Sequence, residues 1–183
     1  MMETDITRRD FFKKAAALTA VAAFPNILLA KSGRDGTRKS IALYNIHTAE
    51  KIEATFWAEG RYLPEEIAEL NRLLRDFRTG DTHPIDLRLF DLLYDIQAAV
   101  GTQRPFQVIS GYRSPKTNAR LRKATSGVAK KSLHMQGRAI DINLPGVELN
   151  RLRLAARSLR RGGVGYYPKS GFVHVDTGRV RYW

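Results

Sequence analysis

The chain contains no cysteine, which excludes a disulfide framework, a thiolate metal site and a cysteine nucleophile. Beyond the first 30 residues, no stretch is apolar for long enough to span a membrane. Acidic residues are also scarce, with 18 Asp and Glu against 31 Lys and Arg, so the net charge is +13. Any metal site must therefore use nitrogen and oxygen ligands on a basic protein.

The positive charge lies almost entirely outside the N-terminal segment. Residues 1–30 hold four basic and three acidic side chains, a net charge of +1, and the remaining +12 belongs to the rest of the chain. Such a surface attracts polyanions: nucleic acid, anionic lipid or an acidic cell-wall polymer. Charge alone does not choose among these partners.

The N-terminal segment has the pattern of an export signal. In "TRRDFFKK", adjacent arginines, a polar residue, two phenylalanines and lysines precede the modestly apolar run "AAALTAVAAFPNILLA". This order is typical of a twin-arginine signal, which directs the export of folded proteins. We therefore predict a signal segment over residues 1–30 and a periplasmic location, with nucleic acid excluded as a partner. Ala30 is the candidate cleavage residue, but Leu28 is bulky for the −3 position, so persistence as an anchor remains an alternative.

The rest of the chain is predicted to form one domain over residues 40–183, preceded by a basic linker over residues 31–39. The 3.6-residue and two-residue periodicities predict an α+β fold, in which helices pack on a small, mainly antiparallel sheet. We expect a monomer. The predicted hairpin covers residues 40–57, the other strands residues 106–110, 138–143, 164–167 and 171–178, and the helices residues 63–78, 86–101, 114–124 and 146–163.

Two predicted strands carry acidic and histidine side chains on the face opposite their apolar residues. In "RAIDIN", Asp141 alternates with two isoleucines, and in "GFVHVDTG", His174 and Asp176 alternate with two valines. If these strands are neighbours, Asp141 and His174 meet on one face, with His134 just upstream beyond Gly137. Catalytic zinc sites use three such protein ligands. The alternative is that each is a satisfied polar residue on a strand.

The surrounding motifs resemble a known family. The pattern Ser132-x-His134-x-x-Gly137-x-x-x-Asp141, followed by a strand histidine, resembles the zinc peptidases grouped with D-Ala-D-Ala carboxypeptidases, D-Ala-D-Ala dipeptidases and the hedgehog signalling domain. The stretches "ISGYRSPKTN" and "GGVGYYPKSGFVHVDTG" resemble one branch, the exported murein endopeptidases of the YcbK type. The resemblance covers nearly the whole chain and implies the fold of that group.

The resemblance implies roles for individual residues. The Zn²⁺ ligands would be His134, Asp141 and His174. Arg113, in the turn "SGYRS", would bind a substrate carboxylate or the developing oxyanion, for which its fork of donors is suited. A structural salt bridge is the alternative for Arg113. Further substrate-binding candidates are Tyr112, Ser132 and Tyr166.

The general base is a departure from the family pattern. Some relatives place a glutamate three residues before the last histidine, where this chain has Gly171, and others a histidine two residues before it, where this chain has Phe172. Asp176 is a candidate base, or a group that orients His174. His47 is a further candidate if the N-terminal hairpin folds over the site; a surface histidine is the alternative.

The function implied by the resemblance is that of a zinc metallo-endopeptidase. It would hydrolyse peptide cross-links of peptidoglycan with a metal-activated water, either between meso-diaminopimelate residues or between D-alanine and diaminopimelate. Its partners would be peptidoglycan peptide stems. The alternatives are a catalytically inactive zinc-containing module that binds peptidoglycan and a basic exported protein that holds wall polymer without a metal.

Overall fold

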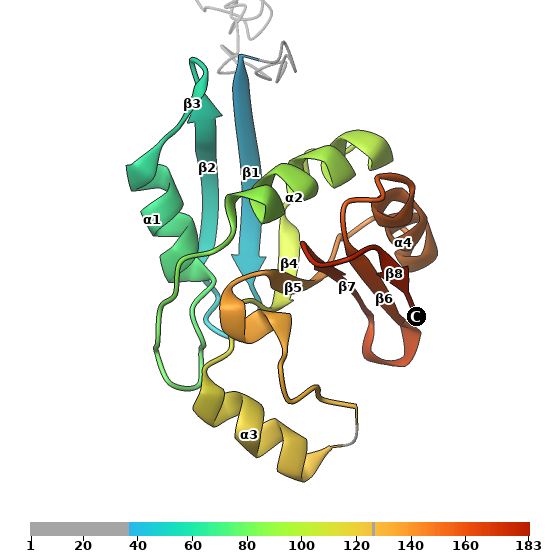
Figure 1. The fold of residues 1–183 in the computed structure, drawn as a ribbon. Helices are drawn as coiled ribbons and strands as arrows, with labels where there is room; N and C mark the ends of the chain where they lie inside the picture. The colour runs from blue at the N-terminus through green and yellow to red at the C-terminus, as the bar shows by residue number, and fades with distance from the viewer. Residues whose placement is uncertain (1–36, 126) are drawn as a thin grey trace, which may run out of the picture. The chain divides into compact units, whose positions relative to one another are not determined.

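A computed structural model describes residues 37–125 and 127–183, so the predicted signal segment lies outside the described residues. The described chain forms helices packed on an eight-stranded sheet with strand order β3-β2-β1-β4-β5-β7-β6-β8 (Figure 1). Most neighbouring strands are antiparallel, and the predicted α+β class is confirmed. None of the helices in this part of the chain has the length and apolar character needed to cross a membrane.

The N-terminal part of the sheet is the predicted hairpin. β1 (Arg38–Asn45) and β2 (Lys51–Ala58) pair antiparallel, and the short β3 (Arg61–Tyr62) continues from β2. β1 begins at Arg38, two residues before the predicted domain boundary at residue 40. β1 also pairs parallel with β4 (Phe106–Ser110), which joins the hairpin to the remaining strands. The sheet is therefore larger than the small sheet expected from the sequence.

The C-terminal part of the sheet brings the chemically active strands together. β5 (Ala139–Asn143) lies between β4 and β7 (Phe172–Asp176), and both pairs are antiparallel. In the β5–β7 register Asp141 stands directly opposite His174, as predicted. β6 (Gly163–Tyr167) pairs with the other edge of β7, and β8 (Arg181–Tyr182) pairs with β6 and forms the edge of the sheet.

The helices begin and end at residues suited to those positions. α1 (Pro64–Leu73) starts with proline, and α2 (Leu87–Val100) is capped by the Asp86 carboxylate and ends at the left-handed Gly101. α4 (Leu149–Ser158) is capped by Glu148. α3 (Pro115–Ala124) is capped by Ser114 and lies beyond the end of the β4 strand, away from the other helices (Figure 1).

The core lies between the sheet and the helices α1, α2 and α4. Ile140, Ile142, Val173 and Val175 of β5 and β7 are all fully buried in it. Each such side chain contributes about 1.5–3 kcal/mol on burial. Because strand side chains alternate, this burial forces Asp141 and His174 onto the opposite face of the same strands.

A buried carboxylate holds the loop that precedes α3. Asp76 is 1% exposed, and its side chain accepts hydrogen bonds from the amide (2.9 Å) and hydroxyl (2.7 Å) of Ser114. Burial raises the pKa of Asp76, but hydrogen bonds from Thr117 and Ser114 and from the Arg78 amide outweigh that effect, so the pKa is lowered. The Asp76 carboxylate therefore stabilises the fold and fixes the residue next to Arg113.

We expect Asp76→Asn to lower the free energy of unfolding by about 1–3 kcal/mol at neutral pH, since a buried network loses its charge-assisted bonds. The pKa of Asp76 is depressed in the fold, so its contribution is complete above the unfolded value of about 4 and is lost as pH falls through the folded value. Urea unfolding of wild type and variant should therefore differ more at neutral than at acidic pH. The control is Asp81→Asn, an exposed acid in the same loop; a loss independent of pH would contradict the prediction.

Candidate metal centre

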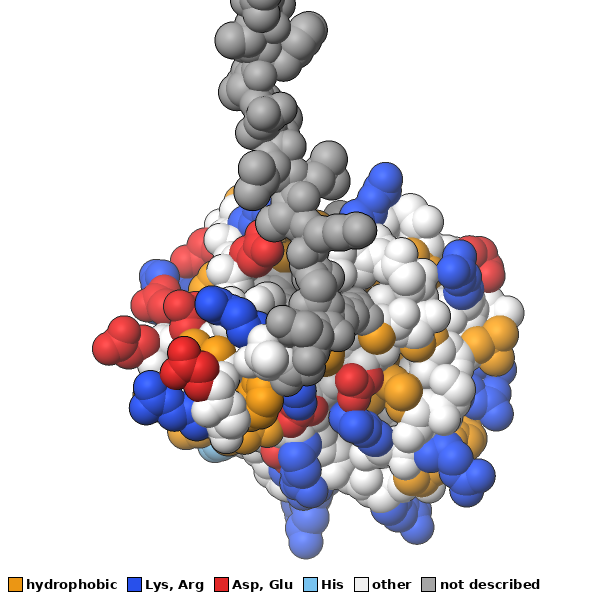
Figure 2. All heavy atoms as spheres, turned by 90° about the horizontal axis from the view of Figure 1, so that it is seen from above, with side chains coloured by type: hydrophobic (Ala, Val, Ile, Leu, Met, Phe, Trp, Pro, Cys, Tyr) orange, Lys and Arg blue, Asp and Glu red, His pale blue; other side chains and the backbone are white. Residues whose placement is uncertain are grey.

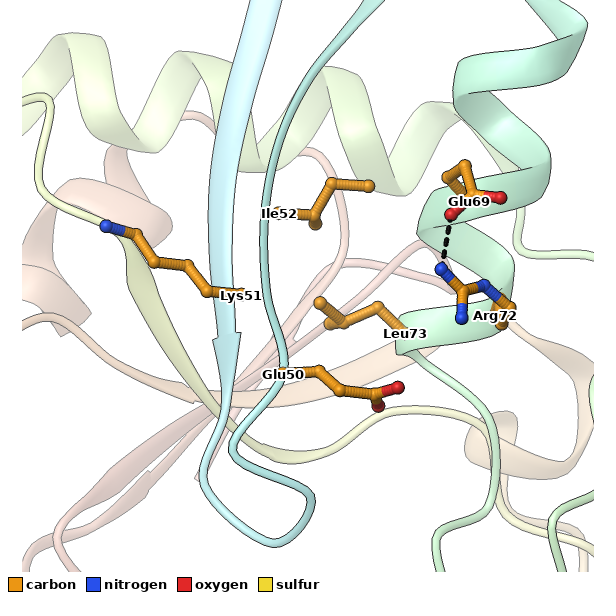
Figure 3. Close-up of a pocket in the computed structure, with 6 residues that line it drawn as sticks. All are labelled: Glu50, Lys51, Ile52, Glu69, Arg72 and Leu73. Atoms are coloured by element: carbon orange, nitrogen blue, oxygen red, sulfur yellow. Dashed lines mark hydrogen bonds and ion pairs between the residues drawn. The ribbon is translucent and has the colours of Figure 1, made fainter.

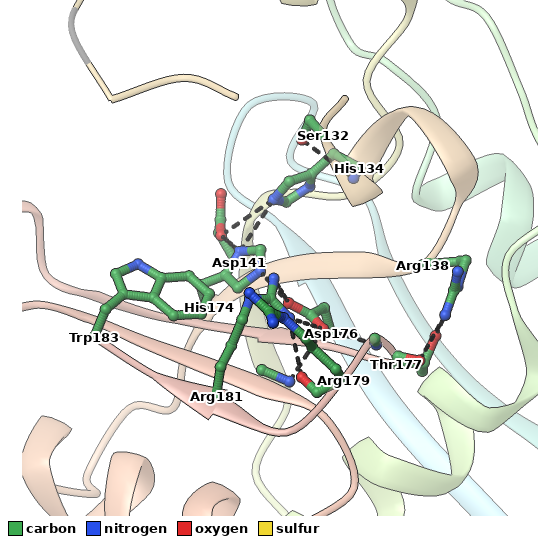
Figure 4. A network of polar contacts seen from close by, with 12 residues as sticks. Ser132, His134, Arg138, Asp141, His174, Asp176, Thr177, Arg179, Arg181 and Trp183 are labelled. Carbon is green, nitrogen blue, oxygen red and sulfur yellow. Dashed lines mark hydrogen bonds and ion pairs between the residues drawn. The ribbon is translucent and has the colours of Figure 1, made fainter. Parts of the chain in front are cut away.

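Three side chains from three elements converge on one point. His134 comes from the short 3-10 helix η2 (Leu133–Gln136), Asp141 from β5 and His174 from β7 (Figure 4). His174 Nδ1 lies 2.8 Å from Asp141 Oδ1, and His134 Nε2 lies 3.3 Å from His174 Nδ1 and 3.4 Å from Asp141 Oδ1. These ligand atoms are close enough to share one metal ion.

The orientation of His134 is set by the loop that follows β4. Its Nδ1 lies 2.8 Å from the carbonyl oxygen of Gly111, which can only accept a hydrogen bond, so Nδ1 is assigned the hydrogen. The lone pair is therefore on Nε2, which faces the other two ligands. Arg113 N donates to His134 O at 3.1 Å, and His134 N donates to the capping hydroxyl of Ser132. η2 ends at Gly137 with φ of 63°, a left-handed conformation that glycine adopts without strain.

His174 is oriented in the same way by Asp176. Its Nε2 lies 3.1 Å from Asp176 Oδ2, so in the neutral ring Nε2–H donates to Asp176 and the Nδ1 lone pair faces Asp141 and His134. In the protonated ring Nδ1–H also donates to Asp141 at 2.8 Å. Two imidazole lone pairs and a carboxylate oxygen thus point at one another. Such electron-pair donors repel unless a cation lies between them. The donor set therefore fits a divalent metal, and its two nitrogens and one oxygen are typical of a catalytic zinc site.

The local field also favours a cation. Burial raises the pKa of Asp141, but His134 and His174 outweigh this effect and hold it well below its usual range. Burial lowers the pKa of His174, yet hydrogen bonds to Asp141 and Asp176 reverse the shift and raise it. The raised pKa of His174 indicates that Asp141 and Asp176 favour positive charge at this point, and a metal ion would compete with protons for it.

Asp176 is fully occupied by structural contacts. It is 0% exposed. Besides His174, it accepts hydrogen bonds from Gly163 N (3.1 Å) and Gly178 N (2.8 Å) and forms two bonds with Arg181 (2.7 and 3.1 Å; Figure 4). The carboxylate is not part of the cleft lining. Of the two roles considered for Asp176, the geometry favours orientation of His174 over that of general base.

We expect Asp176→Asn to weaken metal affinity by about 10- to 100-fold, because the amide cannot orient His174 as the carboxylate does. Competition with a chromogenic chelator measures this affinity. At saturating metal the turnover should recover most of its wild-type value. A large fall in turnover with unchanged affinity would instead identify Asp176 as the base. Asp95→Asn, which removes a surface ion pair with Arg161, is the matched control.

A cleft of about 420 Å³ opens over the metal centre. One side is basic and polar, with Arg113, Lys131 and Ser132. The other side is aromatic: Tyr167 stacks on Phe172 with ring centroids 4.6 Å apart, and Trp183 Nε1 donates to Tyr167 Oη at 2.7 Å. The cleft can therefore accommodate a ligand that combines carboxylates with an aliphatic chain.

Arg113 lies in the cleft with spare donor capacity. Its Nη2 is 3.8 Å from Asp141 Oδ2 and 3.4 Å from Ser110 Oγ, while its buried Nε has no partner among the described residues. Burial lowers the pKa of Arg113, and Asp141 acts in the opposite direction. A guanidinium that is mostly buried and incompletely hydrogen-bonded is suited to receive an anionic ligand group.

The other residues singled out in the sequence take different positions. Ser132 lines the cleft. Tyr166 instead faces a neighbouring hollow, beneath the Arg153 guanidinium. Tyr112 stacks on His83 at 4.8 Å and is not in the cleft lining. His47 stacks on Phe77 and its Nε2 lies 3.0 Å from Ile109 O, also outside the cleft lining.

Trp183 and Arg181 are cleft residues that the sequence reasoning did not select. The Trp183 ring packs 5.3 Å from the His174 ring, and the Arg181 guanidinium lies 4.9 Å from the Trp183 ring. Gly165 permits this packing, since a Cβ there would stand 2.7 Å from the indole. No motif in the sequence marked Trp183 or Arg181 as part of the site.

Neither family position for a general base carries one here. Gly171 adopts a left-handed conformation at the end of the 3-10 helix η3 (Pro168–Ser170), and Phe172 contributes only its ring to the aromatic side. Among the described residues that line the cleft, Asp141 is the only carboxylate.

A second hollow lies between β2 and α1, and its glutamates form ion pairs with arginines (Figure 3). Arg72 pairs with Glu69 at 2.6 Å, and Glu50 pairs with Arg75 at 2.7 Å. Its acidic groups are therefore neutralised by arginines, and it offers no set of donors comparable to that of the metal centre.

An α+β fold with a His/Asp/His donor set at the base of a cleft is typical of a metallopeptidase-type hydrolase. The chain belongs to the family described as Peptidoglycan L,D-endopeptidase MepK, whose model matches residues 34–183. This result confirms the predicted resemblance to the murein endopeptidases of the YcbK type.

Full-length relatives show the same similarity. The chain is 44% identical over 183 residues to the Peptidoglycan L,D-endopeptidase MepK of Escherichia coli strain K12, with 100% of both chains covered. It is 39% identical over 184 residues to the Probable peptidoglycan L,D-endopeptidase MepK of Haemophilus influenzae, covering 100% of this chain and 98% of that one.

Proposed function

We propose that this protein is a zinc metallo-endopeptidase that hydrolyses peptide cross-links of peptidoglycan. The observation that carries the proposal is the inward-facing donor set of His134, Asp141 and His174 beside the incompletely hydrogen-bonded Arg113. The names of the relatives support the substrate and an L,D bond. We propose the cross-link between meso-diaminopimelate residues as the main target, with the bond between D-alanine and diaminopimelate as a second.

The ion would be held by His134 Nε2, Asp141 Oδ1 and His174 Nδ1. When bound there, zinc supplies Lewis acidity towards the scissile carbonyl and towards a water molecule. The reaction is a hydrolysis: the water oxygen bonds to the carbonyl carbon, the C–N bond breaks, and the leaving nitrogen takes up a proton.

The protein's own residues would bind and polarise the substrate. Arg113 is placed to donate hydrogen bonds to the carbonyl oxygen as negative charge develops, or to a carboxylate of the peptide stem. Trp183 and Tyr167 would pack against the aliphatic part of the stem and exclude water from that side. Asp176 would hold the His174 ring in the tautomer that leaves Nδ1 free to bind the metal.

The twin-arginine pattern of residues 1–30, the linker of residues 31–39 and the wall substrate lead us to propose a periplasmic enzyme that acts as a monomer. Replacement of Arg8 and Arg9 by lysine should retain the precursor in the cytoplasm. Fractionation of cells that produce a tagged chain would test export. Secretion of the variant at the wild-type level would contradict twin-arginine export.

The decisive experiment follows the muropeptides of cross-linked sacculi. The purified chain is incubated with sacculi, with and without a chelator, and the soluble products are separated by chromatography. Cross-linked dimers should disappear, persist with chelator and disappear again after zinc is added, and the dimer type that is lost identifies the bond. Unchanged dimers with zinc bound would contradict the proposal and favour an inactive binding module.

A further inference from the structure

The basic residues are distributed unevenly along the chain. Residues 96–140 contain no Asp or Glu, yet they contain nine Lys and Arg: Arg104, Arg113, Lys116, Arg120, Arg122, Lys123, Lys130, Lys131 and Arg138. This stretch supplies β4, α3 and η2, which border the metal centre. By contrast, acidic and basic side chains are mixed on the face seen in Figure 2, which looks from above onto the end opposite α3 in Figure 1.

Six of these side chains are exposed, four on α3 and two on the segment that runs from α3 to η2, and we call this set the basic lip: Lys116, Arg120, Arg122, Lys123, Lys130 and Lys131. The lip is continuous with the cleft, because Lys131 and residues 127–129 also line the cleft. Among the described residues, no acidic side chain forms an ion pair with any member of the lip. Its positive charge is therefore available to a ligand.

Arg78 adds a further positive charge near the lip. Burial lowers the pKa of Arg78, Asp76 opposes the shift, and the positive charge of Arg120 lowers it further. The Arg78 guanidinium is held 4.0 Å from the Phe77 ring centroid. The positive charges of Arg120 and Arg78 therefore oppose each other, and an anionic ligand would relieve this repulsion.

We propose that the basic lip binds the carboxylates of peptide stems adjacent to the scissile cross-link, and so docks the enzyme on the wall polymer. The inference rests on the proposed function, because it takes peptidoglycan as the substrate. Peptide stems carry free carboxylates at regular intervals, so several weak exposed contacts can act together. The lip lies outside the donor set, so it governs attachment to the polymer rather than the hydrolytic step.

The test is a binding measurement that does not depend on hydrolysis. Lys116→Glu/Arg120→Glu reverses two charges on one face of α3, and Arg38→Glu/Arg61→Glu makes the same change in net charge at exposed positions on β1 and β3. Sedimentation with insoluble sacculi measures attachment. We expect about five- to tenfold weaker binding of the lip variant at about 50 mM salt, a smaller difference at about 300 mM, and binding within about twofold of wild type for the control.

Two further arms identify the ligand and separate this proposal from the enzymatic one. Sacculi whose carboxylates have been converted to amides should bind the wild-type protein as weakly as unmodified sacculi bind the lip variant. The wild-type protein and the lip variant should cleave a soluble cross-linked dimer at similar rates. Equal losses in both variants, full binding to amidated sacculi, or a lip-dependent preference for vesicles of anionic phospholipid would overturn the proposal. Failure of wild type to cleave the dimer would refute the proposed function and leave the binding result to be judged alone.

Discussion

We expect His174→Ala to abolish metal binding and to lower endopeptidase activity by about 10³-fold or more. The substitution removes one of the three proposed metal ligands, and the two that remain, His134 and Asp141, are too few to hold the ion. The fold should survive, since the neighbouring core residues Val173 and Val175 remain fully buried on the other face of β7. Metal content by atomic emission, activity on muropeptide dimers and circular dichroism provide the three readouts.

The matched control for this prediction is His83→Ala. His83 stacks on Tyr112 and contacts Pro84 O, away from the donor set, so its loss should leave metal content at the wild-type level. Activity in His174→Ala without bound metal would show that the donor set is not the catalytic centre. Loss of the folded state in that variant would be resolved with His174→Gln, whose side chain is close to histidine in volume.

Arg113→Met should lower turnover by about 100-fold while metal content stays unchanged. The Arg113 guanidinium lines the cleft beside the donor set, and its Nη2 makes only a long contact of 3.8 Å with Asp141 Oδ2, so the terminal nitrogens can donate to the transition state. A buried cation with incomplete hydrogen bonds also costs stability, so the variant should be as stable as wild type or more stable by about 1 kcal/mol. Steady-state kinetics on a purified dimer and thermal unfolding check both parts.

The kinetic pattern assigns the role of Arg113. A fall in kcat with unchanged KM indicates stabilisation of the oxyanion, whereas a raised KM with unchanged kcat indicates binding of a substrate carboxylate. Arg113→Lys retains the charge but loses the planar fork, so it should not restore full activity. Activity of Arg113→Met within about threefold of wild type would mean that this residue has no part in the reaction.

Local periodicity was sufficient to predict most elements of the fold. The alternation in "RAIDIN" and "GFVHVDTG" placed Asp141 and His174 on the polar face of their strands, and the register of β5 and β7 confirms that they are opposite each other. The caps at Asp86 and Gly101 likewise delimit α2 where the pattern begins and ends. These features depend on residues a few positions apart, which is the range over which backbone geometry repeats.

Contacts between distant segments were not accessible in this way. The parallel pairing of β1 with β4 joins residues about 60 positions apart, and it enlarged the sheet beyond expectation. Tyr167 rather than Tyr166 lines the cleft, because the orientation of β6 depends on its pairing with β7 and β8. The placement of Trp183 over His174 depends on the same edge pairing.

The sequence by itself indicated the class of protein, because the motifs that contain His134, Asp141 and His174 resemble one family of zinc peptidases, and the family is confirmed. The tertiary structure decided how the side chains of His134, Asp141 and His174 are oriented toward one another. The Gly111 carbonyl orients the His134 ring and the Asp176 carboxylate orients the His174 ring, so that the lone pairs of His134 Nε2 and His174 Nδ1 face Asp141. The physical reason is that a side chain's tautomer and direction depend on hydrogen bonds from other segments, which exist only once the chain has folded.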